Sequence, residues 1–460
     1  MATYRESARD LPIRDQVDVL VAGGGSAGVI AGAAAARAGA RTLVVERYPF
    51  VGGLVTGGPT GMHTFYNCYH DADGSPNVPP TRKKKIIEGI PQDLVDRLVE
   101  ADACMGHIEL DLAKRFISVI TPVDPEAFKA VALELLLDAG ADLLLNAVVA
   151  DAIVDDQGCV RGVVVESKSG REAILAKAVV DATGDADVAA AAGAPYQLTE
   201  SWPIGMNLRL VGVDVDRFAD TVLDKGLVHQ LGRGVKLGAS EPSVFRLGTS
   251  LEPWREASER HGAGIGGILT TSVRKGDLTH MNCTGIRASG IDAGDLTRAA
   301  IHLRRQISNV AAFFRDAVPG FERSYLVATG PLMGVRRTRQ IRAQFDMPRD
   351  YVLTGQGAED EIGRFAFVDL PDFEVENAGT YGIPYRSLLP REIEGLLVAG
   401  RSLSTDHVVH NSTRNVGCCM VTGQAAGAAA ALAARDEVSP SALDPQRVRE
   451  LLDQQGAYFA

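Results

Sequence analysis

The stretch that most constrains the fold runs from Val17 to Glu46 and reads VDVLVAGGGSAGVIAGAAAARAGARTLVVE. An apolar run, a glycine turn, an alanine-rich run and a second apolar run follow one another, and an acid closes the series. The glycines have the G-x-G-x-x-G spacing, which permits a tight turn, close approach of backbone to a pyrophosphate and packing of a helix on a strand. We predict a β-α-β unit that binds a dinucleotide through Gly23, Gly25, Ser26, Ala27 and Gly28.

The acid at the end of the second run supports this interpretation. Glu46 stands eighteen residues after Gly28, where a carboxylate can accept both hydroxyls of an adenosine ribose. The alternative is an ordinary β-α-β unit whose glycines only turn the chain. A second copy of the spacing, at Gly262, Gly264 and Gly267, follows no strand and precedes β-branched residues, so we expect a glycine-rich loop or bulge there.

Length and composition indicate two lobes and argue against several partners. A chain of 460 residues exceeds what one core usually supports. The net charge of −11 argues against nucleic acid, because such binding depends on Lys and Arg neutralising phosphates. We expect no transmembrane segment: Val19 to Ala36 lacks charges, but its glycine cluster and the strand LVVE behind it fit the β-α-β unit.

The cysteines and the N-terminus favour a cytoplasmic protein. The six cysteines lack a C-x-x-C pair, a pattern that suits reduced thiols better than a disulfide framework or a zinc site. The first residues, MATYRESARDLPIRD, carry too many charges for a signal peptide.

The segment after Glu46, RYPFVGGLVTGGPTG, is too rich in glycine for regular structure. It lies where the chain would pass back over a bound dinucleotide, and its amides could close on phosphates or on a flat ring. The alternative is a flexible surface loop. We assign Arg47, Gly52, Gly53, Leu54 and Thr56 to the cofactor.

The segment from His63 to Pro80 is aromatic and then polar, which is typical of an excursion near a site. We take His63 as a candidate for catalysis and Tyr66 as a candidate for substrate contact. His63 and His70, with Cys68 between them, could suggest a metal site. Such a site usually needs a third and a fourth ligand beyond the two histidines, and we find none nearby in sequence, so we predict no metal. Helical spacing over 91–104 predicts a structural helix.

Residues 121–181 return to the first lobe. The pattern predicts a helix at 125–138, a strand at 142–145, two strands around the turn at Gln157, and a strand ending at Asp181. Val149 would let backbone meet an adenine edge. Thr183 and Gly184 follow the last strand, at the edge where ligands bind in open α/β sheets, although a plain strand-end turn explains them equally well.

The pattern of residues 195–380 differs, with short β-like runs, a helix at 295–315 and many turns. This pattern predicts a mainly antiparallel α+β domain. The arginine-rich run Gly334 to Arg342 has surface charges, and from it we take Arg336 to hold an anionic group of the substrate. A strand at 395–400, a polar loop with two histidines and a small-residue helix from Val416 complete the pattern.

Several motifs follow one another along the chain: GGGSAG, Glu46, VGG, ATGDAD, VAGRSLSTDHVVHNSTR and CCMVTGQAAGAAAALA. With this combination, the chain resembles the FAD-dependent oxidoreductases of the glutathione-reductase-like type. The resemblance covers residues 15–60, 120–200 and 330–435. It implies FAD, with the adenosine on Glu46, the pyrophosphate on the three fingerprint glycines, and the isoalloxazine near the C-terminal loop. The residues implied in that loop are Gly400, Arg401, Asp406 and Gly417.

Two departures from the family pattern qualify what the resemblance implies. Relatives place an acid for the ribityl chain directly after the glycine that corresponds to Gly400, where this chain has Arg401; Asp406 or a backbone amide could substitute. Relatives also carry a glutamate in an Arg-Glu-Ser/Thr-Arg-Arg run where this chain reads Arg336-Arg-Thr-Arg-Gln340.

The expected fold class is α/β, a Rossmann-like FAD-binding domain with an inserted α+β substrate domain. We assign residues 1–65, 120–200 and 380–440 to the FAD-binding domain, 66–119 and 201–379 to the substrate domain, and 441–460 to a tail helix. Oligomeric state stays open.

The expected function is hydride removal from a carbon bearing oxygen or nitrogen on a small organic substrate, with oxygen or a redox partner as acceptor. His407 and His410 are the candidates for the base, because histidine titrates near neutral pH; the alternative is a histidine that only orders the loop. Asn411 and Arg414 would position substrate or contact the flavin, and the vicinal Cys418 and Cys419 suit a core better than a redox pair. The alternatives are a flavin monooxygenase that uses NAD(P)H and a flavin-containing RNA-modification or RNA-binding protein, which the acidic balance disfavours.

Overall fold

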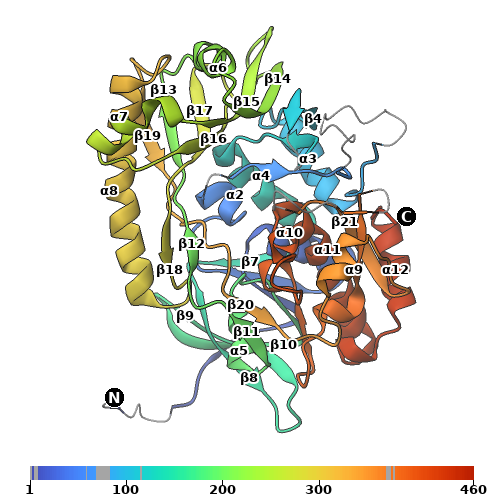
Figure 1. The fold of residues 1–460 in the computed structure, drawn as a ribbon. Helices are drawn as coiled ribbons and strands as arrows, with labels where there is room; N and C mark the ends of the chain where they lie inside the picture. The colour runs from blue at the N-terminus through green and yellow to red at the C-terminus, as the bar shows by residue number, and fades with distance from the viewer. Residues whose placement is uncertain are drawn as a thin grey trace.

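The computed structural model describes residues 3–4, 9–58, 60–68, 83–113, 117–368, 375–376 and 379–459. These residues form a nucleotide lobe around a mixed sheet and a cap around an antiparallel sheet (Figure 1). The cap occupies the upper left of the view, and the C-terminal helices lie on the right. The α/β class with an antiparallel second sheet, expected from the sequence, is confirmed.

The nucleotide lobe has a seven-stranded sheet in the order β7-β2-β1-β10-β9-β8, with β23 also paired to β10. β1 is parallel to both β2 and β10, in the register Val19↔Thr42 and Val19↔Ala178. β9 runs antiparallel to both β10 and β8. The strands are β1 (Ile13–Ala22), β2 (Thr42–Glu46), β7 (Asp142–Leu145), β8 (Val148–Val154), β9 (Val160–Ser167), β10 (Gly170–Asp181) and β23 (Leu396–Val398).

Two helices rich in Ala and Gly pack together beside this sheet. They are α1 (Ser26–Arg37) and α11 (Val416–Asp436). An added Cβ at Gly423 would lie only 2.2 Å from the Ala27 carbonyl oxygen, so the two backbones approach more closely than a larger residue would allow. α11 is apolar and long enough to cross a membrane, but 94% of its apolar window is buried inside the protein, which accounts for its composition.

The cap has a seven-stranded antiparallel sheet in the order β19-β13-β17-β16-β15-β14-β5. Helices α6 (Val215–Leu223) and α8 (Ala293–Ala317) share an apolar core with it. In Figure 1, α8 runs along the left side of the molecule. The strands are β5 (Leu112–Ala113), β13 (Leu208–Val211), β14 (Val228–Val235), β15 (Pro242–Ser250), β16 (Gly267–Thr271), β17 (Asp277–Asn282) and β19 (Tyr325–Thr329).

The remaining helices and short strand pairs complete the two lobes. The helices are α2 (Leu54–Gly57), α3 (Ile90–Glu100), α4 (Pro125–Asp138), α5 (Asp187–Ala191), α7 (Arg255–Arg260), α9 (Arg349–Leu353), α10 (His410–Thr413) and α12 (Pro445–Gln454). The paired strands are β3 (Met62–His63) and β4 (Ile108–Glu109) with β6 (Val119–Thr121), β11 (Tyr196–Leu198) with β20 (Arg339–Ile341), β12 (Trp202–Ile204) with β18 (Ile286–Ala288), and β21 (Glu361–Phe365) with β22 (Tyr381–Pro384).

Several predicted elements are confirmed at their predicted bounds. The predicted helix at 125–138 is α4, the strand at 142–145 is β7, and the strand ending at Asp181 is β10. The small-residue helix begins at Val416 as predicted. At the second glycine spacing, Gly262 and Gly264 have positive φ in a turn before β16, so that copy is indeed a loop.

The packing divides the chain differently from the domain boundaries that we assigned. Helix α3 was placed with the substrate domain, yet its apolar residues Ile90, Leu94 and Leu98 lie in the same core as β1 and α1. Met347 and Phe365, from the end of the assigned insert, lie there too. Apolar faces of short elements are buried against whichever lobe they reach, and spacing in sequence does not reveal which lobe that is.

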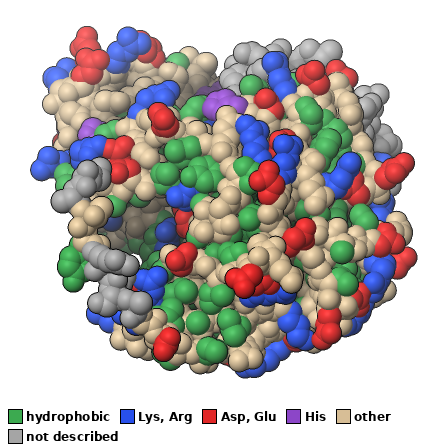
Figure 2. Space-filling view, turned by 90° about the horizontal axis from the view of Figure 1, so that it is seen from below, with side chains coloured by type: hydrophobic (Ala, Val, Ile, Leu, Met, Phe, Trp, Pro, Cys, Tyr) green, Lys and Arg blue, Asp and Glu red, His purple; other side chains and the backbone are tan. Residues whose placement is uncertain are grey.

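Charged groups of both signs are dispersed over the face shown in Figure 2, which lies at the bottom of Figure 1 and is hollowed on one side. This distribution agrees with the net charge of −11 and shows no single basic patch on that face.

Candidate active site

The fingerprint glycines form the turn between β1 and α1. Gly23 has a φ of +98°, and a Cβ at Gly28 would lie 1.7 Å from the Gly23 carbonyl oxygen, so both positions require glycine. Gly25 caps α1 without a side-chain hydrogen bond, and a Cβ there would meet no atom within 4 Å. The first turn of α1 therefore presents its N–H groups to open space, as anion binding requires.

Glu46 is fixed at the end of β2 beside this turn. Its carboxylate accepts hydrogen bonds from the Gly24 N–H (2.7 Å) and the Tyr48 N–H (3.0 Å). Burial raises the pKa of Glu46, and these two donors oppose the shift. The carboxylate is held in one orientation at the edge of the cavity described next.

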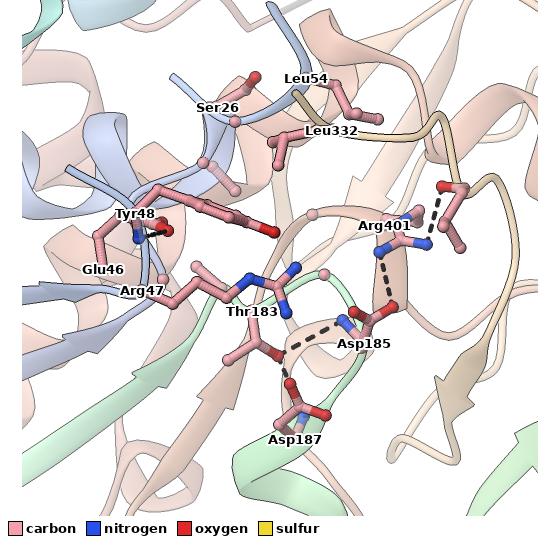
Figure 3. A pocket seen from close by; sticks show the side chains of 18 of the residues that line it. Ser26, Glu46, Arg47, Tyr48, Leu54, Thr183, Asp185, Asp187, Leu332 and Arg401 are labelled. Atoms are coloured by element: carbon pink, nitrogen blue, oxygen red, sulfur yellow. Dashed lines mark hydrogen bonds and ion pairs between the residues drawn. The ribbon is translucent and has the colours of Figure 1, made fainter. Parts of the chain in front are cut away.

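A cavity of about 370 Å³ extends from the fingerprint turn to the C-terminal loop. In Figure 3, Glu46, Arg47 and Tyr48 lie on one side of it, and Arg401 faces Asp185 on the other. The residues predicted from sequence that line it are Gly23, Gly25, Ser26, Ala27, Glu46, Arg47, Gly53, Leu54, Val149, Thr183, Gly184, Gly400, Arg401 and Arg414. Segments almost four hundred residues apart in sequence thus share one wall.

Hydrogen bonds to Asp181 and Asp187 hold the turn after β10 in place. The Thr183 hydroxyl donates to Asp181 Oδ1 (2.7 Å) and accepts from the Asp187 N–H (3.0 Å). Burial raises the pKa of Asp181 to about 6. These bonds hold Thr183 and Gly184 at the cavity wall.

The carboxylate next to Arg401 comes from Asp185. Asp185 Oδ1 accepts from Arg401 Nη2 (2.7 Å) and from the Thr338 hydroxyl (2.9 Å), and both members of the ion pair line the cavity. Asp406, predicted from the family pattern, instead accepts the Val408 N–H (2.7 Å) and does not line the cavity. A carboxylate from the loop after β10, and not Asp406, therefore lies beside Arg401 at the cavity wall.

The two predicted histidines differ in exposure. His410 is 0% exposed, and its Nε2–H donates to the Arg401 carbonyl oxygen (2.7 Å). Burial lowers the pKa of His410 to about 3. Neither histidine lines the cavity, but the complete burial of His410 and its bond to Arg401 count against it as the base and favour the alternative, a histidine that orders the loop.

His407 is exposed, and the guanidinium of Arg337 lies against its ring, with Nη1 2.8 Å from Nδ1 and 2.9 Å from Nε2. Burial and this cation lower the pKa of His407. Arg337 also donates to Asn411 Oδ1 (2.9 Å) and lies 3.9 Å from the Trp202 ring centroid. Burial, together with the charge of Arg414, lowers the pKa of Arg337 to about 10.

Other predicted residues lie behind the cavity wall. Gly28, Gly52 and Gly417 pack so closely against neighbouring atoms that a Cβ would not fit. The Thr56 hydroxyl donates to the Val51 carbonyl oxygen (3.0 Å). Among the proposed substrate residues, Arg336 Nη1 donates to the Pro203 carbonyl oxygen (3.1 Å), and Tyr66 packs edge-on against His107. Neither lines the cavity.

Some predicted residues fall where the structure gives no side chain. His63 is in β3, but its side chain lies outside the described part of the chain, as does His70 altogether. Among the described residues no group of three or more His, Cys, Asp or Glu is arranged to hold a metal. Cys418 and Cys419 are free and buried, and burial raises the pKa of each thiol; Cys419 also lines the cavity.

Sequence reasoning missed part of the cavity wall, including the residues that the cap contributes. Asp185 and Asp187 stand in the ATGDAD run and could have been found as polar groups at a strand end. Leu296, Ala300 and Arg304 share one face of α8, but spacing alone does not say what that face meets. The other missed lining residues include Tyr48, Met206, Gly290, Leu332, Met333, Val335, Val416 and Cys419.

A β-α-β fingerprint, a fixed acid after β2 and a cavity that reaches a second segment far along the chain define a dinucleotide-binding flavoprotein site. The chain belongs to the FAD dependent oxidoreductase family, whose model matches residues 18–452.

The relatives are distant. Two curated relatives, both fumarate reductase (cytochrome) from Shewanella frigidimarina, are 26% identical over 206 residues, which is 39% of this chain. The match spans 35% and 34% of their length.

Solved structures are less similar in sequence. A geranylgeranyl bacteriochlorophyll reductase-like protein from Thermoplasma acidophilum is 16% identical, with a TM-score of 0.48 over 96% of this chain and 84% of that one. The p-nitrophenol 4-monooxygenase from Pseudomonas putida DLL-E4 is 11% identical, with a TM-score of 0.48 over 96% of this chain and 85% of that one.

The residues present fit FAD. The uncapped N-terminus of α1 and the open space at Gly25 suit a pyrophosphate, and Glu46 suits ribose hydroxyls. Arg414 and Arg401, the latter paired with Asp185, line the far end of the cavity. We therefore expect the adenosine near β2 and the ring system near the C-terminal loop.

Proposed function

We propose that the protein is a dehydrogenase or oxidase that removes a hydride from a carbon bearing oxygen or nitrogen on a small organic substrate. FAD, when bound, supplies the hydride acceptor. The chain must then orient the substrate, exclude water and take the proton that leaves with the hydride.

The observation that carries this proposal is the contrast between the two histidines of the C-terminal loop. The His407 side chain is exposed and can exchange a proton with solvent, whereas the His410 side chain is fully buried. The lowered pKa of His407 keeps the imidazole neutral at pH 7, the form in which it can accept a proton.

A chain of polar contacts connects His407 with the cavity. Asn411 Oδ1 accepts from Arg337 (2.9 Å) and lies 3.4 Å from Arg414 Nε, and Arg414 lines the cavity. We assign His407 as the base, and Arg337 and Asn411 as positioning residues. Arg414 would meet the substrate or the flavin, where positive charge stabilises the reduced ring.

The test starts from the purified protein with bound FAD. Alcohols, amines, hydroxy acids and sugars are screened for anaerobic bleaching of the flavin absorption. Bleaching by one class, followed by recovery with oxygen or an artificial acceptor, is the expected result. Rapid reduction by NAD(P)H with substrate present, and oxygen incorporation into the product, would identify a monooxygenase and contradict the proposal.

Two variants separate the histidines. His407→Gln is expected to slow flavin reduction by about 10²- to 10⁴-fold, the usual contribution of general-base catalysis. His410→Gln should lower stability and leave the reduction rate within a few-fold of wild type, because that ring only orders the loop. Equal losses of rate in both variants would contradict the assignment.

A further inference from the structure

Helix α8 of the cap contributes one stripe of residues to the large cavity. Leu296, Ala300 and Arg304 follow one another at a spacing of four and line the cavity. Leu303 and Ile307, on the inner side of the helix, are buried in the cap core. Residues four apart lie on one face of a helix, so α8 turns this stripe, with its one cation, toward the cofactor cavity.

The side chain of Arg304 is held at the start of a cap segment that lines the cavity. Its Nη1 donates to the hydroxyl of Thr329 (2.6 Å), the last residue of β19. Leu332 follows shortly after and lines the cavity, and its N–H donates to the carbonyl oxygen of Gly57 (2.9 Å) at the end of α2. Arg304 is therefore anchored beside cap backbone that contacts α2.

Helix α2 connects this cap segment with the fingerprint turn. Gly53 precedes α2, and a Cβ there would lie 3.0 Å from the Gly25 Cα, so the start of α2 packs on the turn. The four residues of α2 span about 6 Å. Figure 3 shows Leu54 of α2 and Leu332 of the cap at one end of the cavity. Arg304 therefore stands at the end of the cavity that the open α1 amides also reach.

Two other arginines of the cavity wall have carboxylates near them. Arg401 Nη2 lies 2.7 Å from Asp185 Oδ1. Arg47 lies close enough to Glu46 to oppose the rise that burial gives to the pKa of that carboxyl. Within the part of the chain that the structure describes, Arg304 forms no ion pair, and the hydroxyl that it contacts is neutral. Arg304 thus brings a positive charge to the cavity that no described carboxylate offsets.

We propose that Arg304 binds the pyrophosphate of FAD, so that the cap takes part in holding the cofactor. The pyrophosphate carries about two negative charges, whereas a helix N-terminus supplies roughly half a positive charge, so the α1 amides offset only part of it. A guanidinium has five N–H groups, and the contact with Thr329 uses one of them, which leaves others for phosphate oxygens. The inference concerns the cofactor of the family, and it holds whichever substrate the enzyme oxidises.

The test separates the phosphates from the adenosine. Adenosine and ADP are titrated by calorimetry into the full-length protein freed of FAD, because ADP contains the adenosine that we expect at Glu46 and adds two phosphates. In the wild type we expect ADP to bind at least about tenfold more tightly than adenosine. FAD is titrated in the same way, and the rise that it causes in the thermal midpoint gives a second measure of its affinity.

Three variants assign the phosphate contact. Arg304→Met should weaken ADP and FAD about tenfold or more and leave adenosine within about twofold, because it removes a partner of the phosphates only. Arg304→Lys keeps a charge but loses the planar fork, so it should weaken ADP to a smaller extent. Arg305→Met removes the next exposed cation of α8, which does not line the cavity, and should change none of these affinities.

Several results would overturn the inference. Wild-type affinity for ADP and FAD in Arg304→Met would do so, as would a loss that adenosine shares or that Arg305→Met reproduces. Equal binding of ADP and adenosine by the wild type would do so as well. Met is a good helix former at these exposed positions, so we expect both Met variants to fold, and urea unfolding of each apoprotein checks this. If Arg304→Met does not fold, an unchanged ADP affinity in Arg304→Lys is the refuting result.

Discussion

Gly25→Ala should separate cofactor binding from folding. Gly25 has a φ of −72° and a ψ of −170°, values that alanine adopts freely, and a Cβ there would meet no protein atom within 4 Å. The substitution also reduces the freedom of the unfolded chain, so the apoprotein should be about as stable as wild type or more stable by about 0.4–1 kcal/mol. The open space is where we expect the pyrophosphate, and the methyl group would hold it away from the α1 amides.

We expect Gly25→Ala to weaken the binding of FAD. Loss of one hydrogen bond to a charged group is worth about 1.5–3 kcal/mol, or roughly a 10- to 150-fold weaker Kd for FAD. Urea unfolding of the apoprotein and calorimetric titration of FAD measure the two quantities separately. Gly266→Ala, at a glycine in the cap whose Cβ would also meet no atom within 4 Å, is the matched control and should change neither. Wild-type FAD affinity in Gly25→Ala would refute the assignment of this space to the pyrophosphate.

Three further predictions follow from contacts elsewhere in the site. Gly423→Ala puts a Cβ 2.2 Å from the Ala27 carbonyl oxygen and should destabilise the protein by about 1–3 kcal/mol in urea unfolding; an unchanged midpoint would contradict the close approach of α1 and α11. Asp185→Asn leaves Arg401 without its ion-pair partner and should cost about 3 kcal/mol by the same measurement, and an unchanged midpoint would contradict a stabilising pair at this wall. For His407, the neutral form is the base and its pKa lies below 6.5, so kcat/KM should rise with pH below 6.5 and then level off; His407→Gln should lose this acid limb, and its persistence would assign the limb to another group.

The local parts of the nucleotide site could be read from the sequence. Glycine spacing and the acid at Glu46 act over a few residues, where steric rules leave few alternatives, and the turn, α1 and β2 form as predicted. Apolar periodicity likewise located α4 and α11. Family resemblance correctly indicated FAD and the oxidoreductase class.

Contacts between distant segments could not be read in this way. Nothing in the spacing of His407 and His410 shows that one ring is exposed and the other sealed under Arg401. The family pattern indicates Asp406, in the same loop, whereas the carboxylate that pairs with Arg401 is Asp185, from the loop after β10.

The sequence by itself determined that this chain holds a dinucleotide at a glycine turn, because backbone sterics and hydrophobic periodicity are local properties. Only the tertiary structure decided which side chains meet around the cofactor and which residues of the cap form a buried polar row. Arg246, Thr271 and His280 form a row through strand register, and register is set by pairing between strands that no short sequence window contains.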